Sequence, residues 1–475
     1  MEQKRFANLI NWLESTSGKD QATSTISKSL KIINDVHMGR CISAINTIEK
    51  NNKLIKIPKK YLLNYVTVLK HISYFNSGIN EFFKKHIFGF DNIIFQSEND
   101  EITSLYSKLD SKKIFNLTSH QLLTLYITLE NKRKESSFWY PLLSCFPELK
   151  EYSGIPMTWT LKTSSSTDLE LFNSLPNSTK HHALSQLNQF NDDIKAIDSI
   201  LNNLNFKVGH DEYLWSWLAI NTRCLYYKLP LYLPISDSKN SEASNITLVP
   251  FVDLINHSYK SLNTVAIETK FGYEISTIQK IEKDNHLWFT YGPHSDEFLQ
   301  CEYGFSTLRE EFIDKFEEMN IYNCVDISSI ILKLLNSSKK VNVSSWLKQT
   351  SYYGDYTLGI DNVTENNIKT FSTKPSHRTR IAIAALIEND KEFKLDENEG
   401  IIRCPIKLEK FYDGFNDGEY YHKSETILLQ KIIIKVKEDL NSKLESLNSI
   451  KDYDITKFKI VRNLLLNQLF LLNSF

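Results

Sequence analysis

Two strand-rich stretches separated by a long helical one are the feature of this sequence that most restricts its fold. Residues 30–57 carry β-branched runs that are broken by turn residues such as Gly39. Residues 247–289 return to the same texture. Between about 61 and 220, apolar residues instead repeat at helical spacing. The pattern predicts one discontinuous β domain that is interrupted by an inserted helical segment.

The last third of the chain has a different pattern. After about Ser306 the apolar residues follow helical periodicity to residue 475. A chain of 475 residues also exceeds the usual size of a single core, so we expect two lobes. The prediction is an α+β protein with a β domain over residues 1–308 and an all-helical C-terminal lobe over 309–475.

Composition excludes several classes of function. Lys and Arg (56) nearly balance Asp and Glu (57), so no global field attracts nucleic acid. The six cysteines form no CxxC pair, which argues against a zinc site, and we expect no metal. No apolar run is long enough to cross a bilayer. We therefore expect a cytoplasmic protein, or one that is also nuclear, without a membrane or nucleic-acid partner.

A polar cluster follows the apolar strand that begins at Leu248. Asp253, Asn256 and His257 come within ten residues of that strand, and a simple core strand has no need of them. Amide and imidazole groups offer donors and acceptors suited to a bound ligand. The alternative is a turn in which Asn256 caps the chain and His257 packs against the core.

Two Tyr-Gly elements follow in quick succession. A strand ends in Tyr291-Gly292, a short helix comes next, and Tyr303-Gly304-Phe305 closes the pattern. Each element alone is ordinary core architecture. Together with Asn256-His257 they indicate a built site.

The order of these pieces resembles the SET-domain lysine methyltransferases of the Rubisco-methyltransferase-like class, which includes fungal ribosomal-protein methyltransferases. The resemblance covers nearly the whole chain and takes in Met38-Gly39-Arg40-Cys41, Thr222-Arg223, Asn256-His257 and both Tyr-Gly elements. Two departures concern the cofactor contacts of the glycine turn. Cys41 stands where the class usually has a second glycine, and Ser43 lies near a position that is often basic.

The resemblance implies S-adenosylmethionine as cofactor. Asn256 and His257 would bind its amino and adenine groups, and Arg223 would contact its carboxylate. Asp253 would organise the loop rather than act as a base. The full set of implied cofactor-binding residues is Gly39, Arg223, Asp253, Asn256, His257, Tyr291 and Phe305.

The resemblance also implies a catalytic residue and a class of substrate. A free lysine has a pKa of about 10.4, so the site must remove both water and a proton before the amine can attack. Tyr291 is the expected catalytic residue, and Tyr291 and Tyr303 would line the channel for the substrate lysine. The substrate would be a ribosomal protein or another translation component, bound by a monomer whose helical lobe contributes a groove.

Two alternatives stay open at this point. A branch of the same class methylates histidine, although Tyr303 leaves little room for an imidazole ring. The second alternative is a catalytically silent SET-like protein that only binds partners. Retention of Tyr291, Asn256 and His257 argues against it, whereas the departures at Cys41 and Ser43 leave it open.

Overall fold

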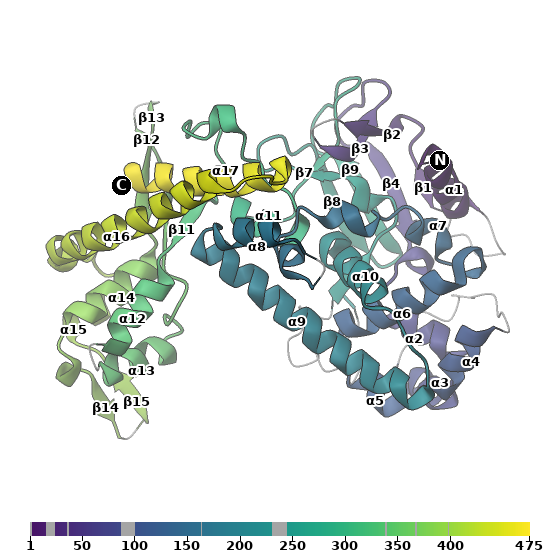
Figure 1. The fold of residues 1–475 in the computed structure, drawn as a ribbon, viewed down its shortest axis with the longest axis horizontal. Coiled ribbons are helices and arrows are strands. Elements are labelled where there is room, and N and C mark those ends of the chain that lie inside the picture. Colours follow the sequence, from purple (N-terminus) through teal and green to yellow (C-terminus); the bar gives the residue numbers. More distant parts are fainter. Residues whose placement is uncertain are drawn as a thin grey trace. The chain divides into compact units, whose positions relative to one another are not determined.

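The computed structural model describes residues 2–15, 24–35, 38–86, 100–162, 164–229, 245–337, 340–365, 368–397 and 399–475 (Figure 1). The chain divides into two compact units. The first comprises Met1–Ser153 and Ser185–Pro293, and the second comprises Gly154–Leu184 and His294–Phe475. Each unit is therefore assembled from two stretches that are separated in the sequence.

A four-stranded antiparallel sheet joins the two strand-rich stretches in the first unit. Its order is β1 (Thr25–Ile26), β4 (Lys53–Pro58), β9 (Gly272–Thr277) and β8 (Thr264–Thr269). Strand β4, from before the helical insertion, pairs with β9, from after it. At this contact a Cβ on Gly272 would lie 2.0 Å from the Ile57 carbonyl oxygen, so only glycine fits. The predicted discontinuous β domain is confirmed.

Three two-stranded sheets complete the β structure described for the first unit. They are the hairpin β2 (Leu30–Asp35) with β3 (Gly39–Ala44), the pair β5 (Cys224–Tyr226) with β6 (Ile246–Leu248), and the parallel pair β7 (Asn256–His257) with β10 (Trp288–Phe289). An isolated bridge between Ser43 and His286 adds β3 to the same neighbourhood. Three of the residues implied in cofactor binding, Gly39, Asn256 and His257, therefore lie on strands that are far apart in the sequence.

The predicted helical insertion is confirmed. Side-chain caps explain where its helices begin: Asn64 and Thr118 each accept a bond from the free N–H groups of the first turn that follows. The helices of the first unit are α1 (Glu2–Glu14), α2 (Tyr65–Ser73), α3 (Ser77–His86), α4 (Glu101–Lys108), α5 (Ser111–Phe115), α6 (Ser119–Arg133), α7 (Tyr140–Leu143) and α10 (His210–Arg223); α9 (Asn177–Leu201) begins in the range of the second unit.

A buried polar network crosses these helices. Glu130 of α6 is fully buried, and its carboxylate accepts bonds from Tyr106 (2.8 Å), Ser137 (2.5 Å) and Arg133 (3.2 Å). This arrangement compensates a charge that would otherwise be costly to bury.

His71 of α2 belongs to the same network and is neutral. Trp139 donates to the Tyr126 hydroxyl at 2.9 Å, and that hydroxyl lies 2.5 Å from Nδ1 of His71. Burial, with help from the charge of Arg133, lowers the pKa of His71 to about 3. The unfolded chain therefore binds a proton below pH 6.5 that the folded chain does not bind until about pH 3.

We expect His71→Asn to reduce the loss of unfolding free energy that occurs as the pH is lowered from about 6.5 to 3. Between about pH 6.5 and 3, the wild-type free energy of unfolding should fall by up to about 1.4 kcal/mol per pH unit through this residue alone. Asparagine keeps a hydrogen-bonding amide near the position of Nδ1 but does not titrate. Urea unfolding of both proteins at several pH values measures the difference, and parallel profiles would contradict the neutral, buried state of His71.

The second unit is largely helical, as predicted for the C-terminal region. Helices α16 and α17 pack against each other, and α8 packs against α17. The helices of this unit are α8 (Ser166–Asn173), α11 (Asp296–Tyr303), α12 (Ser328–Ser337), α13 (Val341–Gln349), α14 (His377–Ile387), α15 (Ile406–Tyr412), α16 (His422–Ser449) and α17 (Ile455–Asn473).

The expectation that residues 309–475 are all-helical is too narrow and needs correction. A three-stranded antiparallel sheet and a two-stranded sheet lie among the helices. Runs rich in Thr, Val and Ile favour extended backbone, and the long hairpin of β12 and β13 has this composition. The strands are β11 (Cys324–Asp326), β12 (Thr357–Glu365), β13 (Ile368–Pro375), β14 (Lys394–Asp396) and β15 (Ile401–Arg403).

Candidate active site

The strand that carries Asn256 and His257 is reached through a strained turn. Phe251 has a φ of 71°, which a bulky residue rarely adopts, and it is only 1% exposed. Burial of its ring in the core holds this conformation, and the chain then enters the short 3-10 helix Val252–Leu254 and β7. Backbone strain of this kind concentrates at functional sites.

His257 and Tyr291 are joined directly. The backbone N–H of Tyr291 donates to Nδ1 of His257 at 3.0 Å, and the two rings lie 5.3 Å apart. Since Nδ1 accepts this bond, His257 is neutral and carries its proton on Nε2. The Tyr291 hydroxyl donates to the carbonyl of Ile255 at 2.9 Å, which fixes the direction of the phenol.

Asn256 links this strand to the glycine turn. Its side-chain amide donates to the Met38 carbonyl at 3.3 Å, and the N–H of Met38 donates to Asp35 at 2.9 Å. Gly39, the next residue, has a φ of +66°, which favours glycine. The structure therefore brings Gly39, Asn256, His257 and Tyr291 close together, and their roles toward a cofactor stay predictions.

Arg223 forms a buried ion pair with Asp253. Its Nη1 lies 2.7 Å from the Asp253 carboxylate, and the two side chains are 13% and 5% exposed. The guanidinium also lies over the ring of Phe146, 5.5 Å from its centre. Burial opposes the charge, but the negative charge of Asp253 outweighs it and raises the pKa of Arg223. The ion pair ties Asp253 to α10, and its predicted role as organiser of the loop stays a prediction.

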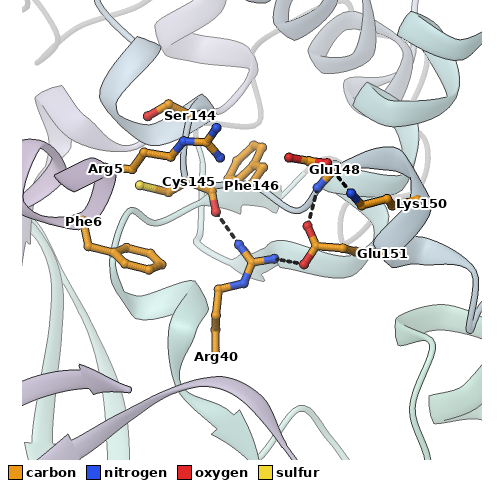
Figure 2. A pocket seen from close by; sticks show the side chains of 9 residues that line it. All are labelled: Arg5, Phe6, Arg40, Ser144, Cys145, Phe146, Glu148, Lys150 and Glu151. Carbon is orange, nitrogen blue, oxygen red and sulfur yellow. Dashed lines mark hydrogen bonds and ion pairs between the residues drawn. The ribbon is translucent and has the colours of Figure 1, made fainter. Parts of the chain in front are cut away.

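A cleft of about 390 Å³ borders the site, next to the glycine turn (Figure 2). Arg40, which follows Gly39, reaches across it and donates to the carbonyl of Cys145 (2.8 Å) and to Glu151 (2.9 Å). The sequence pattern contains no signal for this cleft, because its walls come from segments that look like ordinary helix ends. It is lined by Arg5, Phe6, Arg40, Ser144, Cys145, Phe146, Glu148, Lys150 and Glu151.

The two departures from the glycine-turn pattern lie in the core. Cys41 and Ser43 of β3 are both fully buried. The Cys41 sulfur is 3.9 Å from Nε2 of His286, and burial raises the pKa of its thiol. Neither is therefore positioned as an exposed reactive group.

Tyr303 and Phe305 belong to the second unit. Their rings lie 6.1 Å apart around Gly304, whose φ of +80° ends α11. Backbone packing is tight here, because a Cβ on Gly154 would lie 2.5 Å from the Gly304 carbonyl oxygen. Tyr291 lies in the first unit, so a channel shared by Tyr291 and Tyr303 stays a prediction.

The described ranges contain no group of three or more His, Cys, Asp or Glu side chains placed to hold a metal ion. Within the same ranges, no helix has the length and apolar character that crossing a membrane requires.

The sequence is similar to fungal ribosomal lysine methyltransferases. The C-terminal domain model of ribosomal lysine N-methyltransferase 2 matches residues 323–474. Ribosomal lysine N-methyltransferase 2 of Saccharomyces cerevisiae is 27% identical over 90% of this chain and 89% of that protein. Ribosomal lysine N-methyltransferase set11 of Schizosaccharomyces pombe is 24% identical over 87% of this chain and 84% of its own.

A solved structure extends the likeness to the fold. The SET domain of LSMT, determined with lysine and AdoHcy bound, superposes with a TM-score of 0.54 over 99% of this chain and 90% of that one, at 13% identity. The chain is thus similar to two yeast ribosomal lysine N-methyltransferases over most of its length, and it shares the fold of the LSMT SET domain. In this chain the discontinuous β domain carries the Asn-His strand and Tyr291, and the largely helical region follows.

Proposed function

We propose that this SET-domain chain transfers methyl groups from S-adenosylmethionine to a lysine of a ribosomal protein. The observation that carries the proposal is the hydrogen-bonded line from the Gly39 turn through Asn256 to His257 and Tyr291. These residues differ widely in sequence position, and a purely structural β domain has no need to gather them. The ribosomal substrate is supported by the names of the two yeast relatives.

The residues present fit the cofactor. When bound, S-adenosylmethionine supplies a methyl group on a positively charged sulfur. Asn256, held against the glycine turn, offers a side-chain amide, and a Cβ on Gly39 would meet nothing within 4 Å, so the backbone there is open to an approaching ligand. Arg223 uses Nη1 on Asp253, so its other N–H groups are the donors that a carboxylate would take.

Tyr291 would align the lysine amine. Its hydroxyl proton is committed to the Ile255 carbonyl, so the oxygen presents lone pairs and acts as an acceptor toward reacting groups. An acceptor there can orient an amine N–H and can take weak C–H···O contacts worth about 0.5–1 kcal/mol each. The largest contribution is positioning, which converts an encounter in water into a pre-aligned one.

The experiment that tests the function uses ribosomes as substrate. The purified chain is incubated with labelled S-adenosylmethionine and with ribosomal subunits from a strain that lacks its gene, and the labelled peptide is sequenced. Label on a lysine of one ribosomal protein is the expected result. Label on histidine would favour the histidine-methylating alternative, and binding without transfer to any protein would favour the silent one.

We expect Asn256→Ala to weaken cofactor binding by about 1–3 kcal/mol, because it removes a hydrogen-bonding amide from a polar site. Isothermal titration calorimetry with S-adenosylmethionine measures the change. Asn342→Ala is the matched control, since Asn342 also donates one amide bond of 3.3 Å to a backbone carbonyl, at Asp390 of the second unit. Equal affinities for the two variants would return Asn256 to a structural role in the turn.

Three further parts of the proposal rest on sequence. A monomeric state is implied by the resemblance, whereas a cytoplasmic or nuclear location and the absence of nucleic-acid contacts are expected from the apolar pattern and the charge balance. Ribosomal proteins are made in the cytoplasm and enter the nucleus for assembly, so either location brings enzyme and substrate together.

A further inference from the structure

A single carboxylate braces both ends of α11, the helix that ends in Tyr303. Asp296 opens this helix and is only 1% exposed. One of its oxygens accepts a bond from the backbone N–H of Thr307 at 2.5 Å, and the other accepts from the side-chain amide of Asn323 at 2.8 Å. Both carboxylate oxygens therefore face donors.

The same brace is reinforced from a second segment of the chain. Asn323, 2% exposed, accepts a bond from the backbone N–H of Asp296 at 2.8 Å. Asn320 is fully buried and donates to the carbonyl of His294 at 2.9 Å. The turn between these two asparagines therefore holds the entrance to α11.

The brace closes a loop around the second Tyr-Gly element. Thr307 lies two residues beyond Phe305, so the bond between Asp296 and Thr307 encloses Tyr303, Gly304 and Phe305. Within that loop Gln300 donates to the Gly154 carbonyl at 2.7 Å. The backbone around Tyr303 and Phe305 is thus fixed by buried polar bonds rather than by packing alone.

We propose that Asp296 is a positioning residue that holds Tyr303 and Phe305 in the orientation needed for the lysine channel and for the adenine of the cofactor. The inference rests on the proposed function, because it assumes the roles predicted for those two rings. Asp296 would act through the backbone around these two rings and not by touching substrate or cofactor.

The chemistry of the brace requires an acceptor at two points. The D296N side chain has one acceptor oxygen and one NH₂ group. Whichever way it is turned, the NH₂ group faces another donor, either the backbone N–H of Thr307 or the side-chain amide of Asn323. N323D would place two carboxylates against each other. The double variant D296N/N323D restores every bond between the two side chains with exchanged polarity, because a carboxylate at position 323 can accept from both the amide and the backbone N–H of residue 296.

The test compares these three variants with wild type by calorimetry for S-adenosylmethionine and by steady-state kinetics on the ribosomal substrate. We expect D296N to weaken cofactor binding about tenfold and to lower kcat/KM by at least as much, with the double variant recovering most of both. E425Q is the control, since Glu425 is a buried carboxylate of the same unit that pairs with Arg380 of α14. It should lower the melting temperature without changing either readout.

The outcomes separate this inference from the proposed function. Wild-type protein that binds no S-adenosylmethionine would overturn both. Two outcomes would overturn the inference alone, provided that wild type binds S-adenosylmethionine. In the first, D296N has unchanged affinity and kinetics; in the second, its losses are no larger than those of E425Q. If D296N does not fold, amide hydrogen exchange on wild type decides: the Thr307 amide must be protected, and rapid exchange there would overturn the brace.

Discussion

Replacing Tyr291 with Phe is expected to reduce methyl transfer by about 100-fold or more while folding and cofactor affinity survive. The ring is retained, so the packing near His257 is unchanged, and only the hydroxyl that bonds the Ile255 carbonyl is lost. Removing one pre-oriented donor from an oxyanion hole costs about 10²–10³ in kcat, and we expect a loss of the same order for the pre-oriented oxygen of Tyr291. Single-turnover transfer from labelled S-adenosylmethionine measures the loss.

The first unit provides a matched control for this substitution. The hydroxyl of Tyr227, which is 4% exposed, donates to the Thr269 carbonyl at 3.0 Å, the same kind of bond that Tyr291 makes. Tyr227→Phe should therefore lose a similar bond and keep normal turnover. If the two variants were equally active on a verified substrate, Tyr291 would be a core aromatic and the catalytic assignment would be wrong.

Replacing Arg223 with Met is expected to cost about 3–5 kcal/mol of stability, because it leaves the carboxylate of Asp253 buried without its partner. The charge of Asp253 also contributes to the raised pKa of two nearby thiols, those of Cys145 and Cys224, after burial itself. An unpaired carboxylate in such surroundings is strongly disfavoured. Urea unfolding at pH 7 measures the change.

A compensating substitution distinguishes stability from cofactor binding. Arg223→Met combined with Asp253→Leu removes both charges, and apolar replacement of a buried ion pair is often neutral in stability. We expect this double variant to regain most of the lost stability but not the affinity for S-adenosylmethionine. Recovery of both would show that Arg223 serves the fold and contributes no contact to the cofactor carboxylate.

The sequence was most informative where local pattern and long-range pairing agree. Strands β4 and β9 are separated by the helical insertion, yet both are rich in branched residues and both need a partner. The hairpin of β12 and β13 was missed because the stronger helical periodicity on either side dominated the reading of that region. Hydrophobic periodicity is read over a window that includes the flanking helices, whereas a hairpin depends only on pairing between its own two strands.

The parts of the candidate site that could be predicted are those whose residue types are unusual for a core strand. Asn256, His257 and Tyr291 were singled out, and the bond between His257 and Tyr291 across 34 positions unites them. The pairing of Arg223 with Asp253 was not foreseen, because residues thirty positions apart carry no pairing signal without an alignment. Asp296 was missed for a different reason: an acidic residue in the first turn of a helix is explained by the helix alone.

The order in which the chain is synthesised bears on how the second unit is completed. Asp168 of α8 forms a partly buried ion pair with Lys457 of α17, a residue made 289 positions later. At translation rates of about 5–20 residues per second, that interval lasts about 15–60 s. Trp159 is fully buried in the finished unit, and Lys457, which lies over its ring at 5.8 Å from the ring centre, is absent during this time. A nascent chain of this protein is therefore expected to need a chaperone that shields this segment until its late partners emerge.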